Sequence, residues 1–235
     1  ENIFKKIWIQ PASGDAGGSL GAALSVYYLM LNNFRFVKSN EDSMQGSFLG
    51  PSYENNEVEK ILIKNNANYT KLTKENLLNI VSEDINNGKA IGWMQGRLEF
   101  GPRALGARSI LADPRSSKMQ KILNLKVKYR ESFRPFAPSI LKENLSEWFD
   151  TNEDSPYMLL VANIKKNKMH KMSKSEKDLF GIDKLNIVRS EIPSVTHVDY
   201  SARIQTVTKK NNPIYYELID KFNKISNCPI LINTS

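Results

Sequence analysis

The chain has 235 residues, of which 40% are hydrophobic and 25% are charged, and its formal net charge is +8. These proportions are typical of a soluble globular protein, and no apolar run approaches the roughly 18 residues that cross a membrane. The single cysteine, Cys228, excludes an internal disulfide framework. We expect it to be a small buried hydrophobic side chain, in keeping with a reducing compartment.

The first segment has the pattern of a strand, a glycine turn and a helix. Residues 5–10 predict the strand and residues 19–31 predict an apolar helix. Such a turn lies at the carboxyl end of a strand, where α/β proteins bind ligands. Asp15 lies in this turn and is either a helix N-cap or a metal ligand. Residues 33–56 are expected to be irregular, and we place a domain boundary after residue 50.

The rest of the chain predicts alternating helices and strands. Helices are expected at 57–65, 74–87, 116–127 and 213–225, and strands at 89–95, 109–113, 155–164 and 229–235. Thr73 is an expected N-cap, and Gly88 is expected to end the helix that follows it. A loop with a short helix is predicted between Gly96 and Gly106. The lysine-rich residues 165–179 predict a polar surface loop.

Basic residues concentrate in one stretch of the chain. Residues 88–139 contain eleven bases and three acids, so this window carries a net charge of +8, which equals that of the whole chain. Five of these bases are arginines close to Gly or Pro, namely Arg97, Arg103, Arg108, Arg130 and Arg134. Guanidinium groups beside glycine turns suit the binding of phosphate or carboxylate. The pattern therefore predicts an anion-binding site, with a structural arginine network as the alternative.

Two short motifs add further candidate residues. Lys128 and Arg130 alternate in an expected extended segment, so both cations would project to one side and bracket a triphosphate. The alternative is a solvated basic loop. His197 and Asp199 are expected on one face of a strand, close to Arg203. We interpret His197 as a proton shuttle or phosphate-binding donor, or else as a hydrogen-bonded core histidine.

Several stretches resemble one enzyme family, the O-carbamoyltransferases, which include nodulation-factor, cephamycin and tobramycin carbamoyltransferases. Its C-terminal region is similar to GWMQGRLEFGPRALGARSILADPR and KYRESFRPFAPS. The same family is matched, in the same order, by QPASGDAGGSLGAA, FLGPSY, VTHVDYSARIQTV and PILINTS. Tyr200 departs from the family pattern, which commonly has Gly at that position.

The resemblance implies an α/β (α+β) fold with parts of two modules. Residues 1–50 would be the C-terminal remnant of a metal-binding module, similar to tRNA threonylcarbamoyltransferase and with an actin/hexokinase-like fold. Residues 51–235 would be a YrdC-like domain, with a twisted sheet around a basic concave site. We expect the chain to be an incomplete part of a longer enzyme, because it begins at Glu1 and ends at Ser235 within the family's NTSFN motif.

The chemistry that the family implies has two steps. Carbamoyl phosphate and ATP, with Mg²⁺, give carbamoyl-adenylate in the YrdC-like module, and the carbamoyl group then passes to a hydroxyl of a small natural-product or sugar-like acceptor. The residues expected to act in catalysis are Arg103, Lys128, Arg130 and His197. Those expected to bind nucleotide or carbamoyl phosphate are Arg97, Arg103, Arg108, Lys128, Arg130, Arg134, Arg203, Asn233 and Ser235. Asp15 matches a ligand of iron or another divalent metal in the complete first module.

The main alternative is a YrdC-like module that binds RNA without transferring a carbamoyl group, because aromatic residues accompany the basic ones. We expect nucleic acid not to be the partner, since the bases lie in glycine-rich loops and not in a broad Lys/Arg field. A cytoplasmic enzyme without membrane contact is expected, and a homodimer is compatible with this interpretation. The sequence does not identify the acceptor.

Overall fold

A mixed β-sheet of six strands forms the centre of the structure. The computed structural model describes residues 8–36 and 42–235. The strands are β1 (Ile91–Met94), β2 (Arg108–Ala112), β3 (Ala137–Leu141), β4 (Leu160–Asn163), β5 (Ser201–Val207) and β6 (Ile230–Thr234), in the order β1-β2-β6-β3-β5-β4. The strands β3 and β5 are parallel, and the other neighbouring pairs are antiparallel. This sheet confirms the expected α/β class.

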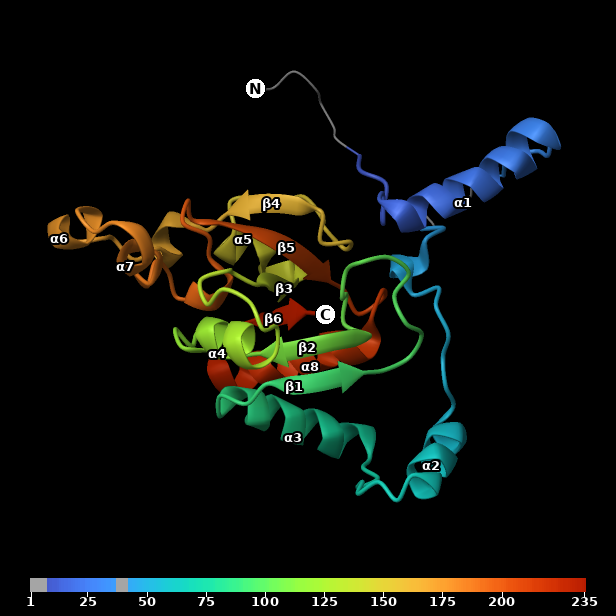
Figure 1. Cartoon of the computed structure of the whole chain (residues 1–235), viewed down its shortest axis with the longest axis horizontal. Helices are drawn as coiled ribbons and strands as arrows, with labels where there is room; N and C mark the ends of the chain where they lie inside the picture. Colours follow the sequence, from blue (N-terminus) through green and yellow to red (C-terminus); the bar gives the residue numbers. More distant parts are fainter. Residues whose placement is uncertain (1–7, 37–41) are drawn as a thin grey trace.

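Two long helices cover one side of the sheet. Helix α3 (Lys74–Asn86) and helix α8 (Pro213–Ser226) pack against each other; α3 also contacts β1, and α8 contacts β3 and β6 (Figure 1). The side chains that α8 buries have the spacing of one helical face and are Tyr215, Leu218, Ile219 and Phe222. The sheet and these helices therefore share one apolar core.

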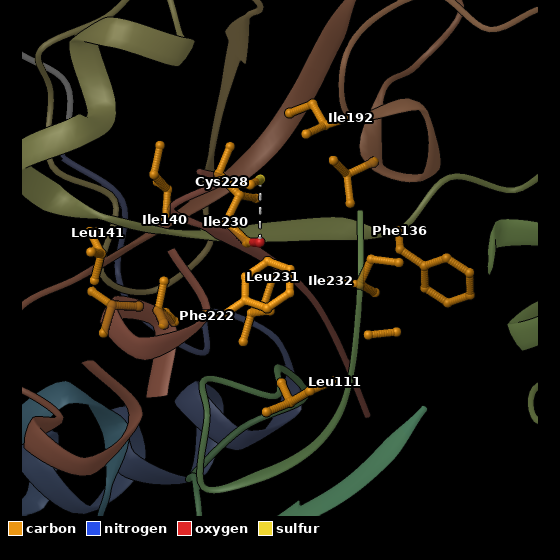
Figure 2. Packing of buried hydrophobic residues seen from close by; sticks show 14 of the residues in the cluster. Leu111, Phe136, Ile140, Leu141, Ile192, Phe222, Cys228, Ile230, Leu231 and Ile232 are labelled. Carbon is orange, nitrogen blue, oxygen red and sulfur yellow. Dashed lines mark hydrogen bonds between the residues drawn. The ribbon is translucent and has the colours of Figure 1, made fainter. Parts of the chain in front are cut away.

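The central strands supply much of that core. All five residues of β3 are buried, and β6 buries its first four. Figure 2 shows Ile230, Leu231 and Ile232 of β6 near Phe222 of α8. Cys228, just before β6, is 1% exposed, and burial raises the pKa of its thiol to about 12. The expectation of a buried, small hydrophobic cysteine is confirmed.

The remaining helices are short or lie at the surface. They are α1 (Asp15–Ser25), η1 (Val26–Met30), η2 (Gln45–Ser47), α2 (Asn55–Lys64), α4 (Met119–Lys126), η3 (Lys142–Asn144), α5 (Leu145–Trp148), η4 (Lys166–Lys168), α6 (Lys174–Lys177), α7 (Gly181–Leu185) and η5 (Pro193–Val195). The predicted caps of α3 are confirmed. Thr73 accepts a hydrogen bond from the Asn76 N–H at 3.3 Å, and Gly88 follows the helix with a φ of +81°.

Several expected elements differ from the structure. The helix predicted between Gly96 and Gly106 is wrong, because this stretch is a loop whose C-terminal N–H groups bond to a carboxylate. The strand predicted from residue 155 begins only at Leu160, because Ser155 Oγ accepts the N–H groups of Leu159 and Leu160 in a turn. The lysine-rich stretch contains the short helices η4 and α6 where a loop was expected.

The N-terminal segment projects away from the sheet. Helix α1 starts at Asp15, before the predicted residue 19, and none of its residues is buried (Figure 1). Of the strand predicted at residues 5–10, residues 8–10 form none and the others lie outside the described residues. The boundary after residue 50 stays a prediction. In the part of the chain that the structure describes, no helix is both long and apolar enough to span a bilayer.

Candidate functional site

A small cavity lies where β3, β5 and β6 meet two basic loops, and we call it the basic cavity. Its volume is about 190 Å³. Its lining residues are Pro102, Arg103, Ala104, Lys128, Arg130, Pro135, Phe136, Ala137, Met158, Arg203, Asn233, Thr234 and Ser235. Six of the nine predicted binding residues are therefore brought together from distant parts of the chain. Among the described residues, no Asp or Glu lines this cavity, so no acidic side chain neutralises the four cations that face it.

The first basic loop runs from Gly101 to Arg108 and contributes Arg103. Its tightest point is Gly106, which has a φ of +99° and packs against the Tyr215 ring. A Cβ atom at this position would lie 2.2 Å from Tyr215 Cδ1. Both the backbone conformation and the space therefore require glycine. The Gly106 carbonyl accepts hydrogen bonds from Trp93 Nε1 at 3.0 Å and Gln95 Nε2 at 3.1 Å, which tie the loop to β1 and to the residue that follows it.

The second basic loop follows α4 and contributes Lys128 and Arg130. The extended segment predicted here is wrong: Tyr129 has a φ of +48°, and the N–H groups of Lys128 and Arg130 bond back to carbonyls of α4. Both side chains nevertheless line the basic cavity. Arg130 is held by Asn124, whose Oδ1 accepts its Nε–H at 2.6 Å, and its guanidinium lies 5.0 Å from the centre of the Phe136 ring. The turn at the end of α4 thus brings both cations to one cavity.

The floor of the basic cavity is a buried polar network across three strands. The register pairs Ser139 with Gln205 and Ala137 with Asn233, so side chains at these positions share one face of the sheet. Asn233 Nδ2 donates to Ser139 Oγ at 3.1 Å, to Gln205 Oε1 at 2.9 Å and to the Ala104 carbonyl at 3.1 Å. Its Oδ1 is buried and has no partner among the described atoms. Because an unpaired buried acceptor is costly, this atom points to a ligand that donates a hydrogen bond.

Arg203 of β5 provides a complementary donor. Its Nε is buried without a hydrogen-bond partner among the described residues, and its Nη2 has only a long contact with Met158 Sδ at 3.8 Å. Burial lowers the pKa of Arg203, and Arg103 nearby lowers it further. A bound anion would pair the donor and offset both effects.

The other two cations of the cavity are also held at an electrostatic cost. Burial lowers the pKa of the Lys128 ammonium, and the Arg130 guanidinium adds to this effect. Burial lowers the pKa of Arg130 as well, followed by repulsion from Arg134, while Glu131 opposes the change. Lys128 Nζ donates to the backbone carbonyl of Ser235. Cations that are partly desolvated and placed close to one another favour an anionic ligand over water.

Two further cavities continue from the basic cavity. The second cavity, of about 310 Å³, shares Arg130, Phe136 and Arg203 with it and adds Arg134 and His197. The third cavity, of about 730 Å³, is lined by α4 and residues 185–198 and shares His197 and Pro135 with the second. The three cavities are therefore neighbours that share lining residues.

His197 lies in a turn, and the strand predicted for it and Asp199 is wrong. Its N–H donates to the Ser201 carbonyl at 2.8 Å, and its carbonyl accepts the Tyr200 N–H at 3.0 Å. Tyr200, the position at which this chain departs from the family pattern, adopts a φ of +65°, a conformation that favours glycine. Burial lowers the pKa of His197, with Arg203 adding to this and Asp199 opposing it. His197 is therefore neutral at pH 7 and reaches the second cavity but does not line the basic cavity.

Three predicted site residues line none of the three cavities, namely Arg97, Arg108 and Asp15. Arg97 donates to the Leu49 carbonyl at 3.0 Å and connects the segment before α2 to the loop ahead of Gly101. Arg108 is exposed on β2 and lines none of the three cavities. Asp15 is exposed in the first turn of α1. In the described ranges, no group of three or more His, Cys, Asp or Glu side chains is placed to hold a metal, so Asp15 is not part of a metal site formed by these residues.

Comparison with known proteins gives the family. Residues 82–235 match the family described as Carbamoyltransferase C-terminus. The chain belongs to this carbamoyltransferase family. Similar proteins are the uncharacterized protein sll1178 of Synechocystis, 51% identical over 100% of this chain and 38% of its own length, and the nodulation protein NolNO of Sinorhizobium fredii, 38% identical over 99% and 31%. Nodulation protein NolO of Bradyrhizobium diazoefficiens is 36% identical over 99% and 39%. The chain thus spans less than two fifths of these relatives' lengths.

Four residues that shape the basic cavity and its two loops were not predicted. They are Glu99, Asn124, Ser139 and Gln205. Glu99 is the single acid between Arg97 and Arg108, and a lone carboxylate before a glycine-rich loop is a weak signal for an acceptor of backbone N–H groups. The other three are uncharged residues in apolar surroundings. Their role depends on which strands become neighbours, so the linear sequence holds no local signal for them.

Proposed function

We propose that this chain is the donor-activating part of an O-carbamoyltransferase. It binds ATP and carbamoyl phosphate at the basic cavity and forms carbamoyl-adenylate. The observation that carries the proposal is the convergence of Arg103, Lys128, Arg130 and Arg203 on one cavity. Among the described residues, no Asp or Glu side chain lines this cavity. Membership of the carbamoyltransferase family supplies the class of reaction.

The sizes of the cavities suggest how the substrates are arranged. The basic cavity, at about 190 Å³, is smaller than typical small-molecule sites and strongly cationic, which suits phosphate and carbamoyl groups. The second and third cavities have room for the larger organic part of a nucleotide. Arg130 and Phe136 line both the basic and the second cavity and would lie beside the phosphates at this junction.

The reaction consumes one water molecule and releases phosphate and pyrophosphate. Water breaks the bond between the carbamoyl group and phosphate of the donor, leaving carbamate. A carbamate oxygen then forms a bond to the α-phosphorus of ATP as the bond to the bridging oxygen of the β-phosphate breaks, and pyrophosphate leaves with that electron pair. Arg103, Lys128 and Arg130 stabilise the negative charge on the phosphate oxygens, because preorganised cations need no rearrangement during the step.

Asn233 and Arg203 would orient the carbamoyl group. Asn233 Oδ1 is an unpaired acceptor and Arg203 Nε an unpaired donor, and both residues line the basic cavity. A carbamoyl group carries one N–H₂ donor and one carbonyl acceptor, which matches this pair. His197, neutral and lining the second cavity, is positioned to receive or return a proton at the edge of the site.

Of the two metal ions in the proposal, Mg²⁺ would bind at the basic cavity, whereas the second ion would bind outside this chain. Mg²⁺ would supply charge neutralisation on the phosphates and would be held mainly by their oxygens, since no described carboxylate lines the basic cavity. An iron or other divalent ion does not fit the described residues, because Asp15 has no partner ligands among them. We assign that metal, together with the binding of a hydroxyl acceptor, to the part of the relatives' length that this chain does not span.

The fold assignment within this proposal is a YrdC-like domain from residue 51 onward, after a remnant of an actin/hexokinase-like module. It is supported by the mixed sheet, whose interior strands β6, β3 and β5 contribute residues to the basic cavity, and by α1, which projects away from the sheet (Figure 1). The proposal also holds that the chain alone does not transfer carbamoyl groups. Formation of a carbamoylated acceptor by the isolated chain would contradict this division of labour.

Calorimetric titration of the 235-residue chain with Mg²⁺-ATP tests the proposal. We expect binding with a stoichiometry near one, and carbamoyl phosphate should then cause pyrophosphate release from ATP. Arg203→Ala should weaken binding, and Lys174→Ala on α6 is the matched control because it removes a cation that lines none of the three cavities. Absence of binding to folded chain overturns the proposal. Tight RNA binding that both substitutions weaken equally would favour the RNA-binding alternative.

A further inference from the structure

We propose that Glu99 is a positioning residue that holds the first basic loop in its ligand-binding shape. Its Oε1 accepts the N–H groups of Leu105 at 2.8 Å, Ala107 at 2.8 Å and Arg108 at 3.1 Å, and its Oε2 accepts the Arg108 N–H at 3.1 Å. One carboxylate thus binds three backbone donors within four residues. Such charge-assisted bonds are about twice as strong as neutral ones.

The loop between Glu99 and Leu105 carries the residues that reach the basic cavity. Arg103 and Ala104 line the cavity, and both precede the N–H groups that Glu99 holds. The carbonyl side of the loop is tied to the sheet: Asn233 Nδ2 donates to the Ala104 carbonyl at 3.1 Å, and Gln205 Nε2 donates to the Leu105 carbonyl at 2.9 Å. Glu99 on one side and the strand amides on the other therefore determine where Arg103 lies.

Glu99 also determines which groups remain for the ligand. A concave set of backbone N–H groups is itself an anion-binding site. Here the carboxylate occupies that set, so an incoming anion meets the side chains of Arg103, Lys128 and Arg130 and not the backbone. Burial raises the pKa of the Tyr215 phenol that packs on Gly106, and the charge of Glu99 adds to this effect to a smaller extent.

The role of Glu99 as a positioning residue rests on the proposed function only for the identity of the ligand. Glu99→Gln keeps the shape of the side chain but replaces Oε2 by an amide donor that opposes the Arg108 N–H. The test compares Mg²⁺-ATP binding by the wild-type chain, Glu99→Gln, Arg103→Ala and the double variant. Glu59→Gln is the control, because Glu59 is a hydrogen-bonded surface carboxylate of α2 that lines none of the three cavities.

If Glu99 acts through Arg103, its substitution weakens binding about tenfold in the wild-type background and less than about threefold once Arg103 is removed. Amide hydrogen exchange should also become faster at Leu105, Ala107 and Arg108 in Glu99→Gln, and not in Glu59→Gln. A general loss of stability would weaken binding equally in both backgrounds. Equal losses, or wild-type affinity in Glu99→Gln, would overturn the role of Glu99.

The two proposals can fail separately. If the wild-type chain does not bind Mg²⁺-ATP, the proposed function falls, while hydrogen exchange at the three amides still decides whether Glu99 holds the loop. If the wild-type chain binds and Glu99→Gln behaves like Glu59→Gln in both measurements, the function stands and the positioning role is wrong.

Discussion

Asn124 Oδ1 accepts the Nε–H of Arg130 at 2.6 Å, and this contact directs the guanidinium toward the basic cavity. Asn124 is fully buried at the C-terminal half of α4. Its Nδ2 donates to the carbonyls of Ser132 at 3.1 Å and Arg134 at 2.8 Å. One amide therefore shapes the whole second basic loop, as Glu99 shapes the first.

Asn124→Ala should destabilise the protein by about 3 kcal/mol, because three part-buried hydrogen bonds, to Arg130, Ser132 and Arg134, are lost together. Urea denaturation measures this change, and Mg²⁺-ATP affinity should fall as Arg130 loses its orientation. Asn167→Ala is the control, since this exposed residue lies within the lysine-rich stretch and lines neither the basic nor the second cavity. Similar urea midpoints for Asn124→Ala and Asn167→Ala would show that Asn124 does not organise the second basic loop.

Lys128→Ala and Arg130→Ala should each cost about 1.5–3 kcal/mol of nucleotide binding, which is roughly 10- to 150-fold in affinity. Arg130→Lys should recover only part of this, because an ammonium has no planar fork and forms no second bond beside the one to Asn124. Calorimetry with Mg²⁺-ATP provides the measurement, with Lys174→Ala as control. Small and equal losses in all variants that shrink together with added salt would indicate diffuse attraction to a basic surface.

Gly106→Ala should destabilise the chain by more than about 3 kcal/mol, because it combines a left-handed backbone with overlap of the Tyr215 ring. Gly92→Ala is a matched control on β1, where an added Cβ meets nothing within 4 Å. That control should be close to neutral. Melting temperatures of the two variants decide the point, and equal melting temperatures would show that the loop relaxes around the new methyl group.

His197 should make the chain less stable in mild acid. Because burial lowers its pKa in the folded state, the unfolded chain takes up the proton first as the pH falls through 6.5. Unfolding free energy should therefore decline as the pH falls through the unfolded-state value near 6.5, and His197→Gln should flatten part of this decline. The measurement is urea denaturation at several pH values. An unchanged slope in the variant would mean that His197 is not desolvated in the native state.

Much of the local structure follows from the sequence because the interactions that decide it span only a few residues. Thr73 and Gly88 delimit α3 through capping, and the spacing of Tyr215, Leu218 and Phe222 defines the buried face of α8. The basic window and its motifs likewise identify the carbamoyltransferase family, since both are properties of the chain in order.

The tertiary structure alone decided which cations meet. Arg103, Lys128, Arg203 and Asn233 are distant in sequence and converge because β3 lies between β5 and β6 in one register. The same packing leaves Arg97, Arg108 and Asp15 outside the basic cavity and turns the backbone at Tyr129, where an extended segment was expected. Polar side chains such as the partly buried Glu99 and the buried Asn124 then fix the conformation of the two basic loops, because each must satisfy its hydrogen bonds with whatever backbone the fold brings beside it.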